Sequence, residues 1–342
     1  MSLRVLGFGS VGRRAAEIAN EKGIKVSRVA DSHGVVKLAI NASLSQLIEQ
    51  KKKGGKFESN SSVSLLDDET GPSVLVDCSA SDSSSKVLVQ ALEKGFGVAL
   101  ANKKPLTESP SVFKAITSNP RARWEATVGA GLPVICTTKR LIDGGDTITA
   151  VQGQLSGTLG FILSRLDDPK LGTFSDAVKE AERLGYTEPD PRDDLGGVDV
   201  ARKILILARY GLGKADMNLN DIAIEPLYPK EFANLPLNKF RERLPELDAA
   251  WKLKTEQARE KGKVLRYTGS VSVDGKAKVG IVEVEKTAPL GGLKGTLNLV
   301  SFTTKFYPEG KNLVVIGPGA GIDVTASAVV ADAFELMNFP KA

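Results

Sequence analysis

The chain has 342 residues, and its 42% hydrophobic and 25% charged content matches ordinary globular proteins, which excludes global disorder. Its net charge of +5 is too small and too dispersed to indicate a nucleic-acid-binding protein. No apolar run approaches the roughly 20 residues that cross a bilayer, and no cleavable leader precedes the first apolar segment. We therefore expect a soluble cytoplasmic protein without nucleic-acid or membrane partners.

Histidine and cysteine are scarce. The chain has one histidine, His33, which excludes serine-protease-type triads and histidine-rich zinc sites. Its two cysteines, Cys78 and Cys136, lie among apolar residues and are expected to be buried thiols rather than a disulfide framework. Any acid or base in an active site must then come from Lys, Asp, Glu or Tyr.

Strands and helices alternate over the first 134 residues. This alternation predicts an α/β domain with a doubly wound parallel sheet of the Rossmann type. The expected strands are 3–6, 25–30, 74–77 and 97–101, and the expected helices are 13–22, 44–53, 86–94 and 112–117.

The pattern changes after residue 134. Alternating strands mixed with helices predict a second, α+β domain over 135–310. Its strands would leave a sheet edge or face exposed, which favours a homodimer. Residues 311–342 repeat a strand, a glycine turn and a helix, and are expected to return to the first domain. The expected strands are 147–155, 265–273, 279–286 and 296–306, with helices at 175–185, 195–210 and 246–261.

A glycine-rich turn follows the first strand. Gly7, Gly9 and Gly12 form a G-x-G-x-x-G motif that opens a helix. Asp31 lies 19 residues after Gly12, at the end of the second strand, where an acid binds the ribose of a dinucleotide. The helix N-terminus would face the phosphates with its unpaired N–H groups. These features predict a site for NAD or NADP, and a purely structural turn is the alternative.

The sequence leaves the choice of dinucleotide open. The carboxylate of Asp31 favours NAD, because it would repel the 2′-phosphate of NADP. Arg28, Lys37 and the cluster 51–53 can supply positive charge for NADP if this region folds inward.

The densest group of polar residues lies at 185–203. A loop with two prolines carries four acids, and the apolar helix after it contains Lys203 one turn after Asp199. A solvated helix start would account for the acids alone. The lysine is different, because burying such a charge pair is costly. Lys203 is therefore the best candidate to protonate a carbonyl group during hydride transfer.

Two further segments carry polar groups. Lys103 and Lys104 follow a strand at the edge where doubly wound sheets bind ligands, although a solvated lysine pair fits equally well. Glu125 precedes a run of small residues whose carbonyl groups can bind a hard cation. A flexible hinge between domains is an equal alternative for this run.

Together these motifs resemble the homoserine dehydrogenase family. The block Asp-Pro-x-x-Asp-Leu-x-Gly-x-Asp-x-x-x-Lys, which ends at Lys203, is the most specific of them. The resemblance implies reversible, NAD- or NADP-dependent reduction of L-aspartate 4-semialdehyde to L-homoserine, in the biosynthesis of threonine, methionine and isoleucine. The matching segments are 7–12, 101–106, 125–133, 156–159, 185–203 and 317–321.

The resemblance also implies that the α+β domain over 135–310 is the substrate and dimerisation domain, and it implies roles for individual residues. Lys203 resembles the proton donor, Asp199 the residue that orients it, and Lys103 a second active-site lysine. Glu188 and Asp194 are similar to the acids that hold the amino end of the substrate. The implied cofactor-binding residues are Phe8, Ser10, Val11, Ser79, Lys103 and Gly321, beside the glycines and Asp31. The implied site for a monovalent cation, Na⁺ or K⁺, consists of Glu125 and the carbonyl groups of Val128, Ala130 and Leu132.

Alternatives to this reading remain at the level of sequence. The protein can be a dehydrogenase of another small amino or hydroxy acid, or a dinucleotide-binding sensor without catalysis. An aldehyde-oxidising enzyme is disfavoured, because it needs a nucleophilic cysteine beside a general base. The chain ends soon after Leu336 and starts with the dinucleotide motif, so we expect no regulatory domain and no fused kinase.

Overall fold

The chain folds into two units. The computed structural model describes residues 2–38, 42–57, 64–67 and 73–338. The first unit consists of Met1–Ile135 and Gly321–Ala342, and the second is Cys136–Ala320. Each unit contains one six-stranded sheet.

The sheet of the first unit is almost entirely parallel. Its order is β3-β2-β1-β4-β5-β6, and only the β2–β3 pair is antiparallel. Its central strands are rich in Val and Leu and are buried, as expected for a sheet covered on both faces. The strands are β1 (Ser2–Leu6), β2 (Lys25–Ala30), β3 (Val35–Lys37), β4 (Ser73–Asp77), β5 (Gly97–Leu100) and β6 (Ala122–Arg123).

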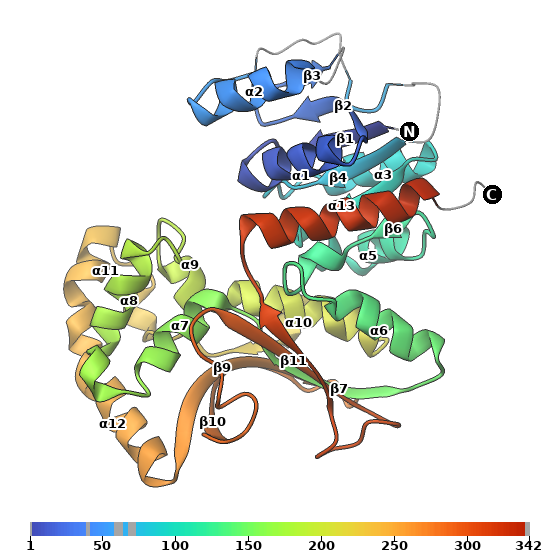
Figure 1. Ribbon diagram of the computed structural model, residues 1–342. Helices are drawn as coiled ribbons and strands as arrows, with labels where there is room; N and C mark the ends of the chain where they lie inside the picture. Colours follow the sequence, from blue (N-terminus) through green and yellow to red (C-terminus); the bar gives the residue numbers. More distant parts are fainter. Residues whose placement is uncertain (1, 39–41, 58–63, 68–72, 339–342) are drawn as a thin grey trace. The chain divides into compact units, whose positions relative to one another are not determined.

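Helices cover this sheet on both faces. The N-terminal helix α1 and the C-terminal helix α13 lie side by side on one face, although they are distant in sequence, and α3 lies behind the sheet (Figure 1). The apolar residues of α1 and α13 form one core with β1 and β4. This confirms the predicted doubly wound class. The helices are α1 (Ser10–Glu21), α2 (Ala42–Lys52), α3 (Ser85–Glu93), α4 (Lys104–Thr107), α5 (Pro110–Thr117) and α13 (Ile322–Asn338), with a 3₁₀ turn, η1, at Glu125–Thr127.

The sheet of the second unit is mostly antiparallel. Its order is β12-β11-β7-β9-β10-β8, and only β8 pairs in parallel, with β10. This agrees with the predicted α+β character. The strands are β7 (Ile148–Gln154), β8 (Ala223–Ile224), β9 (Lys263–Ser272), β10 (Ala277–Glu285), β11 (Leu297–Thr304) and β12 (Leu313–Pro318).

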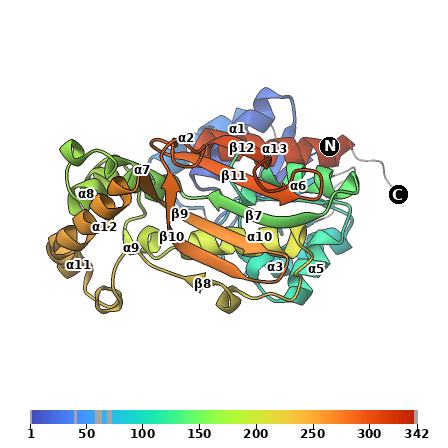
Figure 2. The same ribbon diagram turned by 90° about the horizontal axis from the view of Figure 1, so that it is seen from below.

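Helix α10 covers one face of this second sheet. Ile204 of α10 packs directly on Gly269 of β9, where the missing side chain lets the helix approach. Figure 2 looks onto the sheet from the side away from α10. The helices are α6 (Val134–Asp143), α7 (Gly157–Arg165), α8 (Phe174–Arg183), α9 (Arg192–Leu195), α10 (Val198–Gly211), α11 (Leu237–Arg243) and α12 (Asp248–Glu260). The 3₁₀ turns are Pro169–Leu171, Leu219–Asp221, Lys230–Phe232 and Leu244–Leu247.

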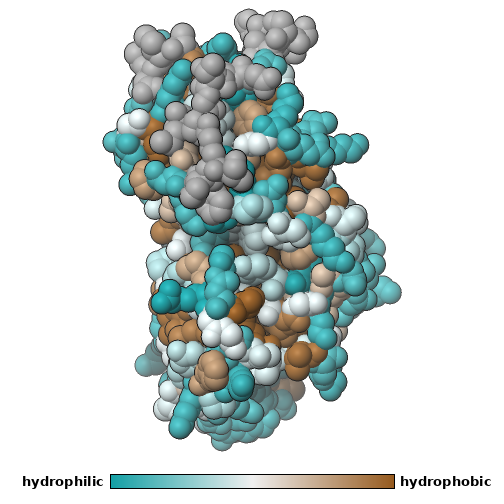
Figure 3. Space-filling view, turned by 90° about the vertical axis from the view of Figure 1, so that its right-hand side faces the viewer, coloured by the Kyte–Doolittle hydropathy of each residue, from teal (hydrophilic) through white to brown (hydrophobic). Residues whose placement is uncertain are grey.

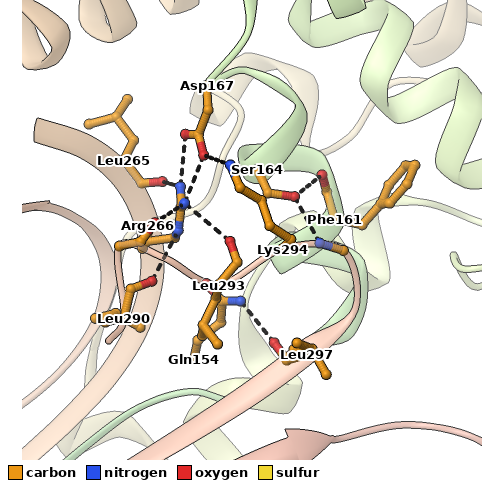
Figure 4. Close-up of polar contacts among 12 residues, drawn as sticks. Gln154, Phe161, Ser164, Asp167, Leu265, Arg266, Leu290, Leu293, Lys294 and Leu297 are labelled. Atoms are coloured by element: carbon orange, nitrogen blue, oxygen red, sulfur yellow. Dashed lines mark hydrogen bonds and ion pairs between the residues drawn. The ribbon is translucent and has the colours of Figure 1, made fainter. Parts of the chain in front are cut away.

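A buried ion pair ties together three segments of the second unit. The guanidinium of Arg266, fully buried on β9, binds both carboxylate oxygens of Asp167 at 2.9 and 2.8 Å (Figure 4). It also donates to the backbone oxygens of Leu290 and Leu293, and Lys294 reaches Asp167 at 3.1 Å. These contacts join the end of α7 to β9 and to the loop before β11, and so fix α7 on the sheet.

Three expectations from sequence need correction. The segment 311–342 does not belong wholly to the first domain, because β12 pairs antiparallel with β11 and only the chain from Gly321 joins the first unit. The helix expected at 195–210 is present as α10 but begins only at Val198, because the left-handed Gly197 separates it from the short helix α9. Cys136 is exposed rather than buried, because α6 turns this residue away from its buried neighbours Val134 and Ile135.

The surface is of mixed character. On the face shown in Figure 3, apolar side chains lie among hydrophilic ones. Among the residues that the structure describes, no helix combines the length and the apolar character needed to cross a membrane.

Candidate active site

The glycine-rich turn is built by close backbone contacts. The N–H groups of Gly7 and Phe8 both donate to the carbonyl oxygen of Ala30, at 2.9 and 3.0 Å, which closes the turn against β2. A Cβ atom on Gly12 would lie 2.1 Å from the carbonyl oxygen of Gly7, so a side chain is excluded there. No side chain caps the start of α1. The N–H groups of this helix end are therefore positioned to bind a diphosphate.

The other residues of the motif differ in what they can offer a cofactor. The ring of Phe8 is buried in the core and packs against Phe57, so only the backbone of Phe8 is available for binding. Ser10 is exposed and Val11 is half-buried. A Cβ on Gly9 would meet no atom within 4 Å, which leaves open space at the centre of the turn.

Asp31 directly follows β2, and its carboxylate accepts hydrogen bonds from three donors. Its Oδ1 accepts the N–H groups of His33 and Gly34 at 2.7 and 3.1 Å, and its Oδ2 accepts the ammonium of Lys51 at 2.5 Å. Burial alone would raise the pKa of this carboxyl, but Lys51 and the two N–H groups outweigh it and hold the pKa below its usual range. Asp31 is therefore ionised at neutral pH.

A polar network at the ends of β4 and β5 was not predicted. The buried carboxylate of Asp77 accepts both the N–H and the hydroxyl of Ser79, at 2.9 and 2.6 Å. The amide of Asn102 reaches Asp77 at 3.2 Å and Ser84 at 3.1 Å, and desolvation raises the pKa of Asp77. The network fixes the loop that contains Ser79. The sequence feature that could have predicted this network is an acid at the end of a buried strand, followed by a run of serines.

The two lysines after β5 occupy different environments. Lys104 donates to the carbonyl oxygen of Ala80 at 2.8 Å and pairs with Asp82 at 2.8 Å, which ties α4 to the serine-rich loop. Lys103 is half-buried at the residue before α4. Lys104 therefore has a structural role, and Lys103 remains the candidate for the active site.

Glu125 lies at the start of η1, between two helices. Its Oε1 accepts the N–H of Ile135 at 2.8 Å, near the start of α6. Its own N–H donates to Oδ2 of Asp332 on α13 at 2.9 Å. Burial, with a smaller contribution from the nearby carboxylate of Glu125, raises the pKa of Asp332 to about 7. The backbone of Glu125 is thus anchored to the C-terminal helix.

The loop after Glu125 has an unusual backbone. Gly129 and Ala130 have φ angles of +82° and +55°, and Ala130 is the one non-glycine residue in the described parts of the chain with positive φ. This conformation costs an L-residue about 1–2 kcal/mol. Val128, Ala130 and Leu132 are all buried, and the carbonyl oxygen of Leu132 accepts the N–H of Val134 at 2.8 Å. One carboxylate and a strained run of carbonyl groups are the donor set that suits a hard monovalent cation.

In the second unit, the ammonium of Lys203 on α10 contacts two oxygen atoms. The ammonium lies 2.7 Å from the carbonyl oxygen of Leu155 and 2.7 Å from Oδ2 of Asp199, one turn earlier on the same helix. The side chain of Lys203 is 10% exposed and that of Asp199 is 46% exposed. The lysine is therefore fixed in position, and its partner connects it to solvent.

Two more acids precede the helix that carries this lysine. Oδ2 of Asp194 accepts the N–H of Glu188 at 2.8 Å, and the hydroxyl of the nearby Thr158 donates to the carbonyl oxygen of Tyr186 at 2.6 Å. Desolvation, helped by the carboxylates of Glu188 and Asp199, raises the pKa of Asp194 to about 6. Asp194 interacts electrostatically with Glu188 and Asp199, and Asp199 pairs with Lys203, so the cluster has three carboxylates and one lysine. This excess of negative charge suits a substrate with an ammonium group.

A left-handed glycine separates the acids from the lysine helix. Gly197 has a φ of +74°, and a Cβ there would lie 2.0 Å from the hydroxyl oxygen of Tyr267. That hydroxyl donates to the carbonyl oxygen of Glu225 at 2.8 Å, which fixes the ring below the helix break. The break ends α9 at Leu195 and sets Val198 as the first residue of α10.

Within each unit, the structure brings most of the predicted residues together. Glu188, Asp194, Asp199 and Lys203 form one cluster in the second unit. In the first unit, the glycine-rich turn adjoins Ala30 and Ser79, and the N–H of Glu125 binds Asp332 of α13. Gly321, with a φ of +137°, directly precedes α13.

The fold and the cluster define the class of the protein. A doubly wound sheet with a G-x-G-x-x-G turn, joined to a unit with a lysine–carboxylate cluster, is typical of an NAD(P)-dependent oxidoreductase that acts on a CH–OH group. Two family models match the chain: the NAD-binding domain of homoserine dehydrogenase at 7–123, and homoserine dehydrogenase at 133–334. The chain belongs to the homoserine dehydrogenase family.

Relatives and solved structures agree with this assignment. The chain is 40% identical to homoserine dehydrogenase of Emericella nidulans over 302 residues, which cover 84% of this chain and 81% of the relative. It is 40% identical to a bifunctional aspartokinase/homoserine dehydrogenase of Zea mays, covering 78% of this chain but 29% of that protein.

Among solved structures, a Candida auris protein of unknown function has a TM-score of 0.85 at 32% identity and covers 98% of this chain and 97% of its own. A hyperthermophilic archaeal homoserine dehydrogenase in complex with NADPH has a TM-score of 0.76 at 24% identity, covering 99% and 98%, and supports the fold.

Proposed function

We propose that this protein reduces L-aspartate 4-semialdehyde reversibly to L-homoserine, with Lys203 as the acid that protonates the carbonyl oxygen. The observation that carries this role is the position of the Lys203 ammonium, 2.7 Å from both Leu155 O and Asp199 Oδ2. Asp199 orients the ammonium and, being half-exposed, provides a route for replacing its proton. In the reverse direction, neutral Lys203 accepts the proton of the substrate hydroxyl.

The amino end of the substrate binds to the acids of the same cluster. Glu188 and Asp194 lie on the loop and short helix before α10, and Asp194 is bound to the Glu188 N–H. An ammonium ion placed between them would offset both the desolvation of Asp194, which is the main cause of its raised pKa, and the added repulsion from Glu188. The positive charge of the substrate's ammonium group would thus balance the excess negative charge of the cluster.

The first unit binds the dinucleotide, which supplies the hydride when bound. The start of α1 receives the diphosphate, and Asp31 lies where the adenosine ribose is read. Ser79, held by Asp77, together with Lys103 and Gly321, would complete the cofactor site.

A monovalent cation, Na⁺ or K⁺, would bind to Glu125 and to the carbonyl groups of Val128, Ala130 and Leu132. The strained Ala130 supports this proposal, because proteins retain such backbone strain chiefly at functional sites. The cation would supply fixed positive charge to the loop. Asp332 and the N–H of Ile135 hold Glu125 in place for it.

The test is to follow reduced-cofactor absorbance after mixing the purified protein with aspartate 4-semialdehyde. NADPH and NADH are used in parallel, each with and without Na⁺ or K⁺. We expect consumption that increases with one of the cations. A protein that binds dinucleotide but consumes neither cofactor would contradict the proposed reaction, and turnover independent of both cations would contradict the cation site alone.

The same proposal includes a homodimer formed through the open face of the second sheet. Gln152 pairs in register with Ser301 and Ser270, and these small polar residues lie on the face opposite to Gly269 and α10. Ile316 of β12 is 49% exposed on the same face. A flat face of small side chains suits sheet-on-sheet packing.

The dimer can be tested by light scattering coupled to size exclusion. Gln152→Arg would bring like charges together at the proposed interface and should shift the mass from dimer to monomer. Gln90→Arg, on the exposed side of α3 in the first unit, is the matched control and should leave the mass unchanged. A wild-type monomer, or a dimer unaffected by Gln152→Arg, would contradict this interface. We propose that the enzyme works in the cytoplasm, on the route to threonine, methionine and isoleucine.

A further inference from the structure

The second unit has a pocket beside the turn that connects α12 to β9. Its volume of about 490 Å³ lies in the range of small-molecule binding sites. Leu163 and Leu166, at the end of α7, and Leu265 of β9 form apolar parts of its wall. All three leucines are buried, so the core of the unit holds this wall in place.

Three cationic residues line the same pocket. Arg259 lies in the last turn of α12, Lys263 begins β9, and Lys286 directly follows β10. The N–H of Lys286 donates to the carbonyl oxygen of Gly262 at 3.4 Å, which brings the end of β10 to the turn between the other two cations. Positive charges from three segments therefore meet at one pocket.

The protein itself neutralises these cations only in small part. Lys263 lies 3.9 Å from the carboxylate of Glu285, a side chain that is 62% exposed. Within the described parts of the chain, the side chains of Arg259 and Lys286 form no hydrogen bond or ion pair. The pocket therefore has an excess of positive charge, which attracts an anion.

The acid in the pocket wall is already neutralised. Among the described residues that line the pocket, Asp167 alone is acidic. Its two carboxylate oxygens bind the guanidinium of Arg266 at 2.9 and 2.8 Å, and Lys294 lies 3.1 Å from Oδ2 (Figure 4). Two cations thus surround one carboxylate, so Asp167 does not cancel the positive charge of the pocket.

We propose that this pocket is a second binding site, for a small organic anion with an apolar body, of the class that a medium-chain carboxylate represents. The leucines of the wall bury the hydrocarbon chain of this ligand. Arg259, Lys263 and Lys286 bind its carboxylate through charge-assisted hydrogen bonds.

The proposed site lies at the far end of α7 from the active-site lysine. α7 begins shortly after Leu155, whose carbonyl oxygen binds the ammonium of Lys203, and its nine residues extend over about 13 Å. Leu163 and Leu166 lie at its other end. The ligand is therefore bound apart from the substrate, and the proposal does not depend on the proposed reaction.

The test measures the dissociation constant of sodium octanoate for the full-length protein by titration calorimetry, without dinucleotide or substrate. The double variant Arg259→Gln/Lys286→Gln removes two exposed charges and should weaken octanoate binding about 10- to 100-fold. Thr255→Trp places a large ring in the pocket wall and should abolish binding while leaving the charges intact. Lys252→Gln/Lys254→Gln, at exposed positions of α12 outside the pocket wall, is the matched control and should leave the constant unchanged.

Two further probes separate the contributions of charge and hydrocarbon chain. Octanamide has the same chain without the charge and should bind about 10- to 100-fold more weakly than octanoate. Inorganic phosphate has charge without a chain and should bind at least about tenfold more weakly, because burial of each CH₂ group contributes to affinity. Equal affinity for octanoate and either probe would overturn the proposed class of ligand.

The remaining outcomes decide whether the pocket is the site. Loss of octanoate binding in both pocket variants, with melting temperatures near the wild-type value, would support the proposal. It would be overturned by a wild-type protein that does not bind octanoate, or by pocket variants that bind it normally. Displacement of octanoate by saturating homoserine would place it in the active site and would also overturn the proposal.

Discussion

The glycine-rich turn of the first unit and the lysine face of α10 in the second unit are built in opposite ways. In the turn, backbone N–H groups provide the binding surface, and Gly12 excludes any side chain because a Cβ would meet Gly7 O at 2.1 Å. On α10, the backbone is only a scaffold, and Lys203 and Asp199 carry the chemistry. A backbone-built site is damaged by adding atoms, and a side-chain-built site by removing them. Four predictions test this contrast.

The largest effect is expected from removing the lysine. Lys203→Met should lower kcat by about 10²- to 10⁴-fold, because a positioned general acid contributes that much. Dinucleotide affinity should remain near the wild-type value. The measurement is steady-state turnover together with calorimetric binding of the dinucleotide. Lys179→Met, on the exposed side of α8, is the control. Near-normal turnover of Lys203→Met would exclude the role proposed for Lys203.

The next effect comes from adding one methyl group to the turn. Gly12→Ala should destabilise the protein by about 3 kcal/mol, because the backbone must move to admit the Cβ. Gly9→Ala meets no atom within 4 Å, so it should cost less than about 1 kcal/mol of stability while weakening dinucleotide binding about tenfold. Urea unfolding and dinucleotide titration measure the two effects. Equal stability losses in the two variants would contradict the contrast.

Substitution of Asp194 tests whether a carboxylate of the active-site cluster lowers the stability of the folded protein. Its folded-state pKa of about 6 is above the ordinary value, so the native state holds its proton more tightly and stability falls as pH rises from about 4 to 6. Asp194→Asn should therefore stabilise the protein by about 1–2 kcal/mol at pH 8 and by little at pH 4.

The same variant should raise KM for homoserine, and it should abolish the fall of wild-type kcat/KM below about pH 6. Unfolding curves at both pH values and a pH–rate profile measure these effects. A variant that is less stable than wild type at pH 8 would contradict the burial argument.

The smallest effect concerns Ala130 in the proposed cation loop. Ala130→Gly should stabilise the protein by about 0.5 kcal/mol, because relief of the left-handed strain exceeds the entropic cost of glycine. Ala126→Gly, in the core nearby, should destabilise it. Thermal unfolding in the presence and absence of K⁺ measures both. A loss of stability in Ala130→Gly would show that the side chain matters more than the backbone strain.

Local patterns explain why much of the molecule was predictable. The four-residue spacing of Asp199 and Lys203 placed them on one helical face, and they form the expected ion pair. The alternation of strands and helices gave the doubly wound sheet, and the spacing from Gly12 placed Asp31 at the end of β2. Each of these inferences depends on residues that lie within one helical turn or one strand–helix–strand unit of the sequence.

Contacts between distant segments were not predictable in this way. A strand, a glycine turn and a helix look the same whether the strand is parallel or antiparallel, so the pairing of β12 with β11 was missed. The contact of Lys51 with Asp31 depends on how α2 packs, and the Asp77–Asn102 network joins two loops. Apolar neighbours suggested a buried Cys136, but the period of α6 turns it to the surface.

Gly197, which packs against the Tyr267 ring, also determines the direction in which each side chain of α10 points. Each residue of an α-helix turns the next side chain by about 100°, so a helix that began one residue earlier or later would point Lys203 well away from Leu155. The sequence of α10 would be unchanged, yet the ammonium would no longer meet its two oxygens. Because Gly197 fixes where α10 begins, it determines that the side chain at position 203, and not a neighbouring one, meets these oxygens.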